Sequence, residues 1–592
     1  MHEQTIVKKV LFWVFTLLLP VIILLVIELL LRLGGYNKTE QKLFVDAPMQ
    51  SEYLTTNPLF FNRYFPSFTP SVAPNTFLKN KEPNTFRVFV LGGSSTEGFP
   101  YNYYNSFSGR LEQKLLVDTQ GLHIEVINLG ATAVNSYVIW DLRKSIMKYE
   151  PDAILIYSGH NEYYGSFGVG SSQFGLGDKI WLKRTILTLK NSVLYQFLES
   201  IIKPKTPDIS EDRTMMAQVV SDSDITFNGE VFQSGVVQFN NNISDVISYF
   251  KDKNVPIYIG TIASKLKDQA PLGENDEAVK VYNEGEALYE ANEKERAYSK
   301  FEEAKELDPI RFRAPSAIND IIRGFEERSK VMIVDVEQLA IDSSKSGIPD
   351  SSFFIDHLHP NWKAHQYIGE LFFDEMMKDS RLKKYYAPNS VATRPEISEF
   401  EETYGTVPIL RLTAGYPFVK GLSQDEELAI FKRRYNALLT NNYEDSLATR
   451  TWLNQEPVPL ALTKVVEMNI AKHDTLNMAR SYMSLAHWHI FSEALLKKGV
   501  EYPINNRRSD SYNVLTLHLI LSKKRTDPFF VNKLAGIYMF NNDFERAEYY
   551  LNESKKLNPT SAELMLNYSR FYILQGDTVT ATRYFQRYRS SR

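Results

Sequence analysis

The residues of this sequence best suited to catalysis are a serine, a histidine and an aspartate that lie far apart in the chain. Ser94 stands in the glycine-flanked segment GGSST (92–96), directly after an apolar run. Asp356 precedes His359 by three residues. In a helical or tightly turned segment, this carboxylate can hold the imidazole Nδ1–H while Nε2 faces the serine. A serine activated in this way is a nucleophile for acyl transfer.

Two further segments offer donors for a developing negative charge. The segment NLGATA (128–133) follows a second apolar run, and SGHNE (158–162), which contains Asn161, follows a third. The loops after parallel strands converge at one edge of a sheet. A backbone N–H of the first loop and the Asn161 amide would then complete an oxyanion hole beside the serine.

The elements that must position these loops are short, apolar and rich in β-forming residues. They occupy 87–91, 124–128, 153–157, 256–261 and 331–336. Helical patterns lie between them, as in 108–116 and 237–251, and a further amphipathic helix is expected over 362–377. Buried strands alternating with helices predict a three-layer α/β/α domain with a mostly parallel sheet.

Four blocks in this order resemble the SGNH/GDSL hydrolase superfamily of esterases and lipases. They are Gly-x-Ser-x-[Ser/Thr], Asn-x-Gly, Gly-x-Asn-[Asp/Glu] and Asp-x-x-His, within residues 86–380. The resemblance implies a flavodoxin-like fold and no cofactor. It implies that Ser94 is the nucleophile, His359 the general base and Asp356 the residue that orients it. Asn161 and the N–H of Ser94 would donate to the oxyanion.

The sequence departs from the family pattern at two positions. The aspartate of the first block is Gly93 here, and the glycine that usually donates from the second block falls on Ala133. An alanine N–H serves equally if its φ permits, and Gly130 is the substitute donor. Neither change removes an essential group, so an active enzyme is expected.

Other polar residues in these blocks leave alternatives open. Ser95 is the adjacent hydroxyl, which we interpret as a capping or backbone-bonding serine. His357 and His365, with Asp356 and His359, imitate a metal cluster. A His-x-His pair on a tight turn points in alternate directions, however, and no second acidic cluster is evident. No metal site is therefore expected.

Three further residues are candidates for lining the substrate cleft. His160 lies beside the expected oxyanion donor Asn161. Arg311 and Arg313 could reach a polar or anionic substrate, and ion pairing at the surface is the equal alternative.

The composition excludes several classes of protein. The 592 residues carry a net charge of −4 and include no cysteine. This length predicts several domains. The charge balance argues against a nucleic-acid partner, which needs a basic face. Disulfides, cysteine-ligated zinc and cysteine-linked lipids are excluded.

An apolar run near the N-terminus predicts a membrane anchor over residues 10–33. Its length of about 36 Å exceeds the roughly 30 Å of a bilayer core. No small-x-small cleavage site follows, which favours an uncleaved helix over a signal peptide. Flanking charges do not decide the orientation. We expect residues 1–9 to be a cytoplasmic tail and the single-pass chain to place its catalytic domain outside the cytoplasm.

The remaining segments predict a connector, a helical insert and a helical domain. Proline-rich residues 34–85 are expected to form an extended connector without regular structure, and 381–424 a linker. Small residues at helix contacts predict a TPR-like insert at about 276–325. Residues 425–592 resemble a TPR-like array, because matching positions such as Ala547 and Ala581 lie 34 residues apart. A helical bundle with a chance period is the alternative.

These features together predict a membrane-anchored, extracytoplasmic serine esterase. The favoured substrate is an O-acyl or O-acetyl group on a carbohydrate or another polar molecule. The alternatives are a lipase or acyltransferase acting on lipid or glycan, and a scaffold whose TPR-like domain binds a protein partner while the hydrolase fold is inactive.

Overall fold

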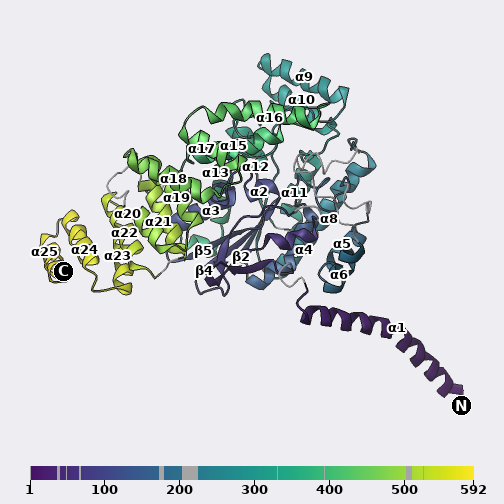
Figure 1. Cartoon of the computed structure of the whole chain (residues 1–592), viewed down its shortest axis with the longest axis horizontal. Helices are drawn as coiled ribbons and strands as arrows, with labels where there is room; N and C mark the ends of the chain where they lie inside the picture. The colour runs from purple at the N-terminus through teal and green to yellow at the C-terminus, as the bar shows by residue number, and fades with distance from the viewer. Residues whose placement is uncertain are drawn as a thin grey trace.

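A five-stranded parallel sheet lies at the centre of the computed structural model (Figure 1). The structure describes all residues except 1, 37–40, 49, 66–68, 172–178, 203–223, 330, 392–393, 502–509, 524–525 and 592. The strands are β4 (Thr85–Gly92), β5 (His123–Asn128), β6 (Ala153–Tyr157), β7 (Ile257–Gly260) and β8 (Met332–Val334), in the order β5-β4-β6-β7-β8. Every residue of β4 is buried, as expected for a strand covered on both faces.

Helices cover both faces of this sheet, which confirms the predicted α/β/α fold. The helices α3 (Phe107–Asp118) and α13 (Trp362–Met376) pack together on one face, where the rings of Phe107 and Phe372 stack at 5.3 Å. The helices α4 (Ser136–Ile146), α8 (Glu230–Lys251) and α11 (Ser316–Ser329) pack on the other. Right-handed crossovers between parallel strands require this division. The short elements between them are α2 (Ser94–Glu97), η2 (Tyr103–Asn105), η3 (Met147–Tyr149) and α12 (Val336–Ser343).

The prediction of an unstructured connector over 34–85 is wrong. This segment contains an antiparallel sheet of β1 (Phe44–Ala47), β2 (Gln50–Thr56) and β3 (Thr76–Leu78), with the 3₁₀ helix η1 (Pro58–Arg63) between β2 and β3. The rings of Phe44 and Phe77 contact each other at 4.8 Å and both approach Phe89 of β4 at 6.1 Å. Contacts with distant aromatic residues therefore stabilise strands that are too short and proline-bounded to predict.

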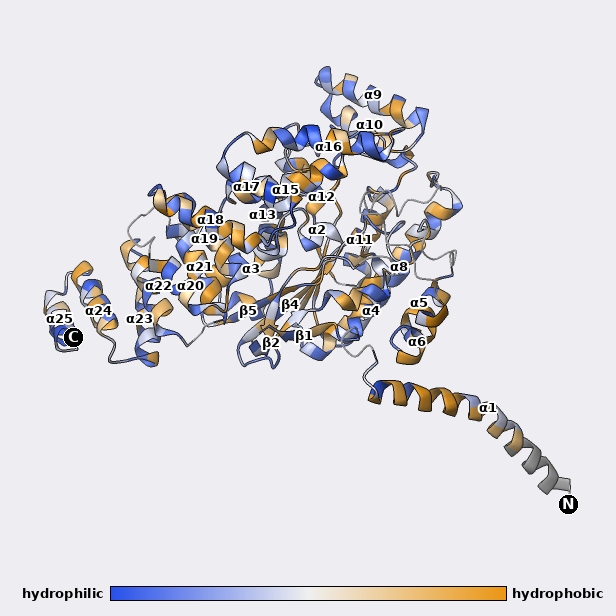
Figure 2. Cartoon of the chain, in the orientation of Figure 1, coloured by the Kyte–Doolittle hydropathy of each residue, from blue (hydrophilic) through white to orange (hydrophobic). Residues whose placement is uncertain are grey.

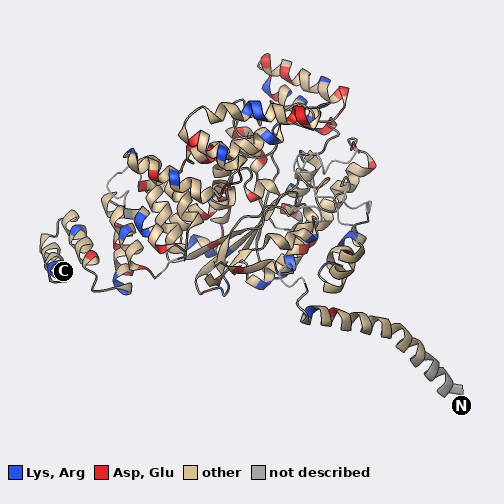
Figure 3. Cartoon of the chain, viewed as in Figure 1, with Lys and Arg blue, Asp and Glu red and all other residues tan. Residues whose placement is uncertain are grey.

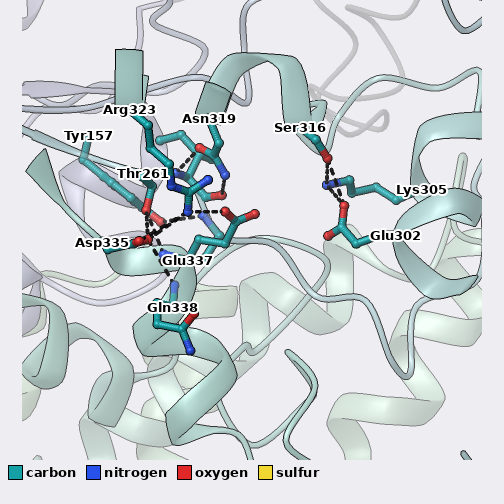
Figure 4. Close-up of polar contacts among 12 residues, drawn as sticks. Tyr157, Thr261, Glu302, Lys305, Ser316, Asn319, Arg323, Asp335, Glu337 and Gln338 are labelled. Atoms are coloured by element: carbon teal, nitrogen blue, oxygen red, sulfur yellow. Dashed lines mark hydrogen bonds and ion pairs between the residues drawn. The ribbon is translucent and has the colours of Figure 1, made fainter. Parts of the chain in front are cut away.

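Polar contacts fasten α11 to the edge of the sheet (Figure 4). Asn319 accepts from the N–H of Ile262 at 2.7 Å and donates to its carbonyl at 2.8 Å. Arg323 of α11 pairs with Asp335 and Glu337 at 3.1 and 2.7 Å. These bonds fix the chain that enters the sheet after the helical insert.

The insert itself is a helical hairpin of α9 (Asp276–Glu290) and α10 (Lys294–Leu307). Gly285 lies against the ring of Phe301, where a Cβ would sit 3.0 Å from the ring. The hairpin projects from the body at the top of Figure 1.

Helices make up the C-terminal region. They are α14 (Ser380–Lys383), α15 (Glu399–Leu412), α16 (Gln424–Leu439), α17 (Tyr443–Leu453), α18 (Val458–Ala471), α19 (Thr475–Trp488), α20 (Glu493–Glu501), α21 (Asp510–Lys523), α22 (Pro528–Phe540), α23 (Phe544–Leu557), α24 (Ala562–Leu574) and α25 (Thr578–Ser590). The expected linker 381–424 therefore contains α15, which begins with a capping box between Ser398 and Glu401.

The last four helices repeat with the predicted spacing. The pair α22–α23 and the pair α24–α25 begin 34 residues apart, and Ala547 and Ala581 are buried at equivalent places. The TPR assignment stays a prediction.

Near the N-terminus, α1 (His2–Leu33) leaves the body and is apolar over most of its length (Figure 2). Among the described residues, Phe12–Leu33 is the one helix long and apolar enough to cross a membrane. Its C-terminal end reaches the hairpin of α5 (Ile180–Leu189) and α6 (Val193–Ile202). Acidic and basic residues are scattered along the rest of the chain (Figure 3).

Candidate active site

Ser94 lies at the first turn of α2, immediately after β4. The turn requires glycine at position 92, because a Cβ there would lie 2.1 Å from the Tyr157 carbonyl oxygen. A Cβ on Gly93 would lie 2.4 Å from Asn161 Nδ2, the end of a side chain. This close approach of β4 to the loop after β6 is possible because the two strands are neighbours in the sheet. The serine therefore sits at the point where the strand order reverses, where α/β proteins bind ligands.

The structure brings Ser94, His359 and Asp356 into one hydrogen-bonded series. Ser94 Oγ lies 2.8 Å from His359 Nε2, and His359 Nδ1 lies 2.6 Å from Asp356 Oδ2. The other carboxylate oxygen of Asp356 accepts the N–H groups of Leu358 and His359 at 2.9 and 2.8 Å. With Nδ1–H donated to the carboxylate, Nε2 is the acceptor for the serine proton.

The environment keeps Asp356 ionised although it is buried. Burial alone would raise its pKa, but the nearby imidazoles of His359 and His357 and their hydrogen bonds lower the pKa well below its ordinary value. A carboxylate that stays charged can stabilise an imidazolium formed during reaction.

Three N–H donors surround the serine. Ala133 has a φ of 60°, which turns its peptide into the left-handed region. Among the described residues, the N–H groups of Ser94 and Ala133 have no hydrogen-bond acceptor. Asn161 Nδ2 donates one proton to the Val134 carbonyl at 3.1 Å. This bond orients the amide and leaves its second proton to be donated to an oxyanion. Ser94, Ala133 and Asn161 line the same cavity.

Gly130 does not take part in this arrangement. Its N–H donates to Asn128 Oδ1 at 2.7 Å. Its Cα packs against α2, where a Cβ would lie 2.3 Å from the Glu97 nitrogen. The Asn128 side chain also donates to Thr96 and Ser108 at 2.6 and 2.8 Å. The asparagine of the second block therefore holds the serine turn in place.

The predictions for His160, Arg311 and Arg313 as cleft residues are wrong. His160 is buried, accepts the N–H of Ala314 at 3.2 Å, and has its pKa lowered to about 3 mainly by burial. Arg311 donates to the Glu306 carbonyl at 2.6 Å. Arg313 pairs with Asp308 at 3.1 Å. Both arginines thus bond to residues at the end of the insert, and neither lines the cavity beside Ser94, whereas Phe312 between them does.

The cavity beside Ser94, called the Ser94 pocket below, has a volume of about 330 Å³. It is lined by Ser71, Ser94, Phe99, Thr132, Ala133, Asn161, Tyr164, Gly165, Phe312, His357, Leu358, His359, Pro408, Arg411 and Leu412. Its wall is mostly apolar, and the last three residues come from α15. Sequence reasoning missed Phe99, Phe312 and the α15 residues, which belong to no motif.

Two polar residues close to the reacting groups in sequence, Ser95 and His365, do not line the Ser94 pocket. Ser95 is buried, and its hydroxyl has no hydrogen-bond partner among the described residues. His365 Nδ1 accepts the Phe107 N–H at 3.2 Å. No group of three or more His, Asp and Glu within the described part of the chain is placed to hold a metal ion. A larger cavity of about 620 Å³ lies between β2 and α21, and its lining includes none of the predicted site residues.

The chain was compared with known proteins. No family model and no curated protein matches the sequence. Solved structures similar to it include a lipase/acylhydrolase from Enterococcus faecalis (12% identity, 52% of this chain and 99% of that chain, TM-score 0.27). A second is a GDSL-like lipase from Bacteroides thetaiotaomicron (11% identity, 49% of this chain and 88% of that chain, TM-score 0.26). A third is a catalytic mutant of Axe2, an acetylxylan esterase from Geobacillus stearothermophilus (12% identity, 50% of this chain and 96% of that chain, TM-score 0.25). At these values the similarities assign no role to any residue.

Proposed function

We propose that this chain is a serine esterase of SGNH/GDSL type that hydrolyses a carboxylic ester through an acyl-enzyme. The observation that carries the proposal is the series of hydrogen bonds from Ser94 Oγ through His359 to Asp356, at 2.8 and 2.6 Å. The free N–H donors beside the serine oxygen supply the second requirement of acyl transfer, which is a site for the oxyanion.

In the first half of the proposed reaction, His359 Nε2 accepts the Ser94 proton as Oγ attacks the ester carbonyl. The N–H groups of Ser94, Ala133 and Asn161 donate to the tetrahedral oxyanion. His359 then gives its proton to the leaving alcohol, and the acyl group remains on Ser94. In the second half, water gives its proton to His359 and attacks the acyl carbon, which releases the acid and restores the serine.

The pocket favours a short acyl group on a polar alcohol. At about 330 Å³ it is near the lower end of the range for ligand sites. Its lining includes the apolar side chains of Phe99, Phe312 and Leu358 and the hydroxyl-bearing residues Ser71 and Thr132. We therefore favour an O-acetyl or short O-acyl ester of a carbohydrate or another polar molecule. A lipid acyl ester and transfer of the acyl group to a second hydroxyl are the alternatives.

The proposed location is a membrane, with α1 as the anchor and the catalytic domain outside the cytoplasm. The length and apolar composition of Phe12–Leu33 support the anchor.

Labelling with a fluorophosphonate followed by peptide mapping tests the nucleophile in the full-length protein. Wild type should be labelled on Ser94 and should hydrolyse p-nitrophenyl acetate faster than p-nitrophenyl octanoate. Ser94→Ala should abolish both properties. Ser95→Ala is the matched control and should keep them, because the Ser95 hydroxyl makes no hydrogen bond to His359. A folded wild-type protein with neither labelling nor turnover would instead support a scaffold with an inactive hydrolase fold.

A further inference from the structure

The end of α1 is bonded to the tip of the α5–α6 hairpin. The Glu28 carboxylate accepts the hydroxyl of Ser192 at 2.8 Å and the N–H groups of Val193 and Leu194 at 3.1 and 2.6 Å. These N–H groups begin α6, where the helix dipole favours a negative charge. Arg32 pairs with Glu28 and donates to the Asn191 carbonyl at 3.1 Å. A carboxylate one helical turn before the end of α1 thus caps the second helix of the hairpin.

Contacts continue beyond the end of α1. The Tyr36 hydroxyl donates to Ser200 Oγ at 3.0 Å, and its ring meets Phe197 edge-on at 5.5 Å. The hairpin therefore holds the chain on both sides of the point where α1 ends.

The same hairpin is fastened to the catalytic domain. Arg184 of α5 pairs with Asp245 of α8 at 2.7 Å and donates to Asn242 at 2.9 Å. Arg63 of η1 donates to Asn191 Oδ1 at 2.7 Å. The α5–α6 hairpin thus connects α1 to the α/β domain and is called the bridge below.

Large apolar side chains on this bridge face outward. The exposed fractions are 68% for Trp181, 46% for Leu189, 43% for Leu198, 64% for Ile201 and 76% for Ile202. In Figure 2 the ribbons of α5 and α6, which lie near the end of α1, are partly orange. Several exposed apolar side chains gathered on one short hairpin point to a contact with another apolar phase.

We propose that the α5–α6 hairpin rests in the interface of the lipid bilayer that α1 crosses, and that it fixes how the catalytic domain stands on the membrane. The bilayer is the expected occupant because the patch continues from the membrane-spanning helix itself, through bonds at Glu28, Arg32 and Tyr36. Tryptophan and aliphatic side chains on a short helix are typical of interfacial segments. The inference rests on the proposed anchor.

This placement bears on the substrate. No residue of α1, α5 or α6 lines the Ser94 pocket. Figure 1 likewise places α2, which begins at Ser94, apart from these three helices. A hairpin seated in the bilayer therefore holds the pocket away from the lipid surface. The ester that reaches it is then carried by a molecule in the aqueous space and not by a lipid of the same bilayer.

Site-directed spin labelling tests the proposal directly, because the chain has no native cysteine. Nitroxide labels at Leu198→Cys and Ile202→Cys report on the hairpin. Leu24→Cys on α1 is the control for the anchor, and Val579→Cys, at a site 72% exposed on α25, is the aqueous control. The full-length variants are placed in phospholipid nanodiscs, and circular dichroism checks that each is folded. Electron paramagnetic resonance then measures access to oxygen and to a water-soluble nickel chelate.

The labels at 198 and 202 should be more accessible to oxygen than to nickel, as at position 24, and unlike the label at 579. Nickel access equal to that at 579, with position 24 in lipid, would overturn the hairpin contact and leave the anchor intact. Protection from both reagents would overturn it in favour of a protein partner or a second copy. An aqueous position 24 would remove the anchor and with it the inference, whereas the esterase proposal depends only on Ser94 labelling.

Discussion

Gly93 offers a sharp test of how the site is built, because adding one methyl group there should disable an oxyanion donor. A Cβ at this position would lie 2.4 Å from Asn161 Nδ2, 3.3 Å from the Val134 carbonyl oxygen and 3.6 Å from Asn161 Cγ. The nearest atom is the far end of a side chain, and it can move away at small cost. Gly93→Ala should therefore leave the fold stable while it displaces the Asn161 amide from the oxyanion.

The expected magnitude follows from the loss of one donor. Removal of a single oxyanion hydrogen bond typically costs about 2.7–4 kcal/mol of barrier, or about 10²–10³ in kcat. Gly93→Ala should show a loss of this order for p-nitrophenyl acetate, with little change in KM. Its thermal unfolding midpoint should remain close to that of wild type.

A double-mutant cycle decides whether the effect passes through the amide. Asn161→Ala alone should cost about as much as Gly93→Ala. The double variant should lose no more than either single variant, because the donor is already gone. Losses that multiply, or a Gly93→Ala enzyme with wild-type kcat, would refute the role assigned to Asn161.

Three other substitutions have definite expected outcomes. Asp356→Asn should lower kcat by about 10⁴, because an amide no longer holds His359 in the tautomer that accepts the serine proton. Steady-state kinetics measures this loss, with circular dichroism as the check of folding. Turnover at the wild-type rate would contradict the role of Asp356. Phe312→Ala should widen the Ser94 pocket and raise the ratio of butyrate to acetate hydrolysis of p-nitrophenyl esters, and an unchanged ratio would place the acyl group elsewhere. Burial raises the pKa of Glu162 from 4.5 to about 7 against the hydrogen bonds from Ser136, so the folded protein loses stability as the pH rises between these values. Glu162→Gln has no carboxyl group and should not lose stability in this way. The difference between its thermal unfolding midpoint and that of wild type should therefore grow in favour of the variant from about pH 5 to about pH 8. A difference that stays constant with pH would contradict the raised pKa.

The strands of the central sheet could be predicted because each is a continuous apolar run between turn residues. The run 87–91, for example, lies within β4, which is buried along its whole length. The strands β1 to β3 had no such signal. Their stability comes from contacts such as those of Phe44 and Phe77 with Phe89, and these depend on residues distant in sequence.

The reacting residues could be predicted for a related reason. Each lies in a short contiguous block, and parallel strands bring the ends of these blocks together. The pocket wall has no such blocks. Arg311 and Arg313 were expected in the cleft, but the residue that lines it is Phe312 between them. Sequence alone did not show which face of that segment is turned to the serine.

The contribution of α15 changes what counts as the smallest working unit of this protein. Pro408, Arg411 and Leu412 form one side of the Ser94 pocket, although they follow the α/β domain in sequence. Glu401 of the same helix accepts hydrogen bonds from Asn105 at 2.8 Å and from Ser484 of α19. A fragment cut after α14 would retain every reacting group and yet lack part of its own substrate cavity. A displacement of α15 relative to the α/β domain would therefore change the shape of the Ser94 pocket.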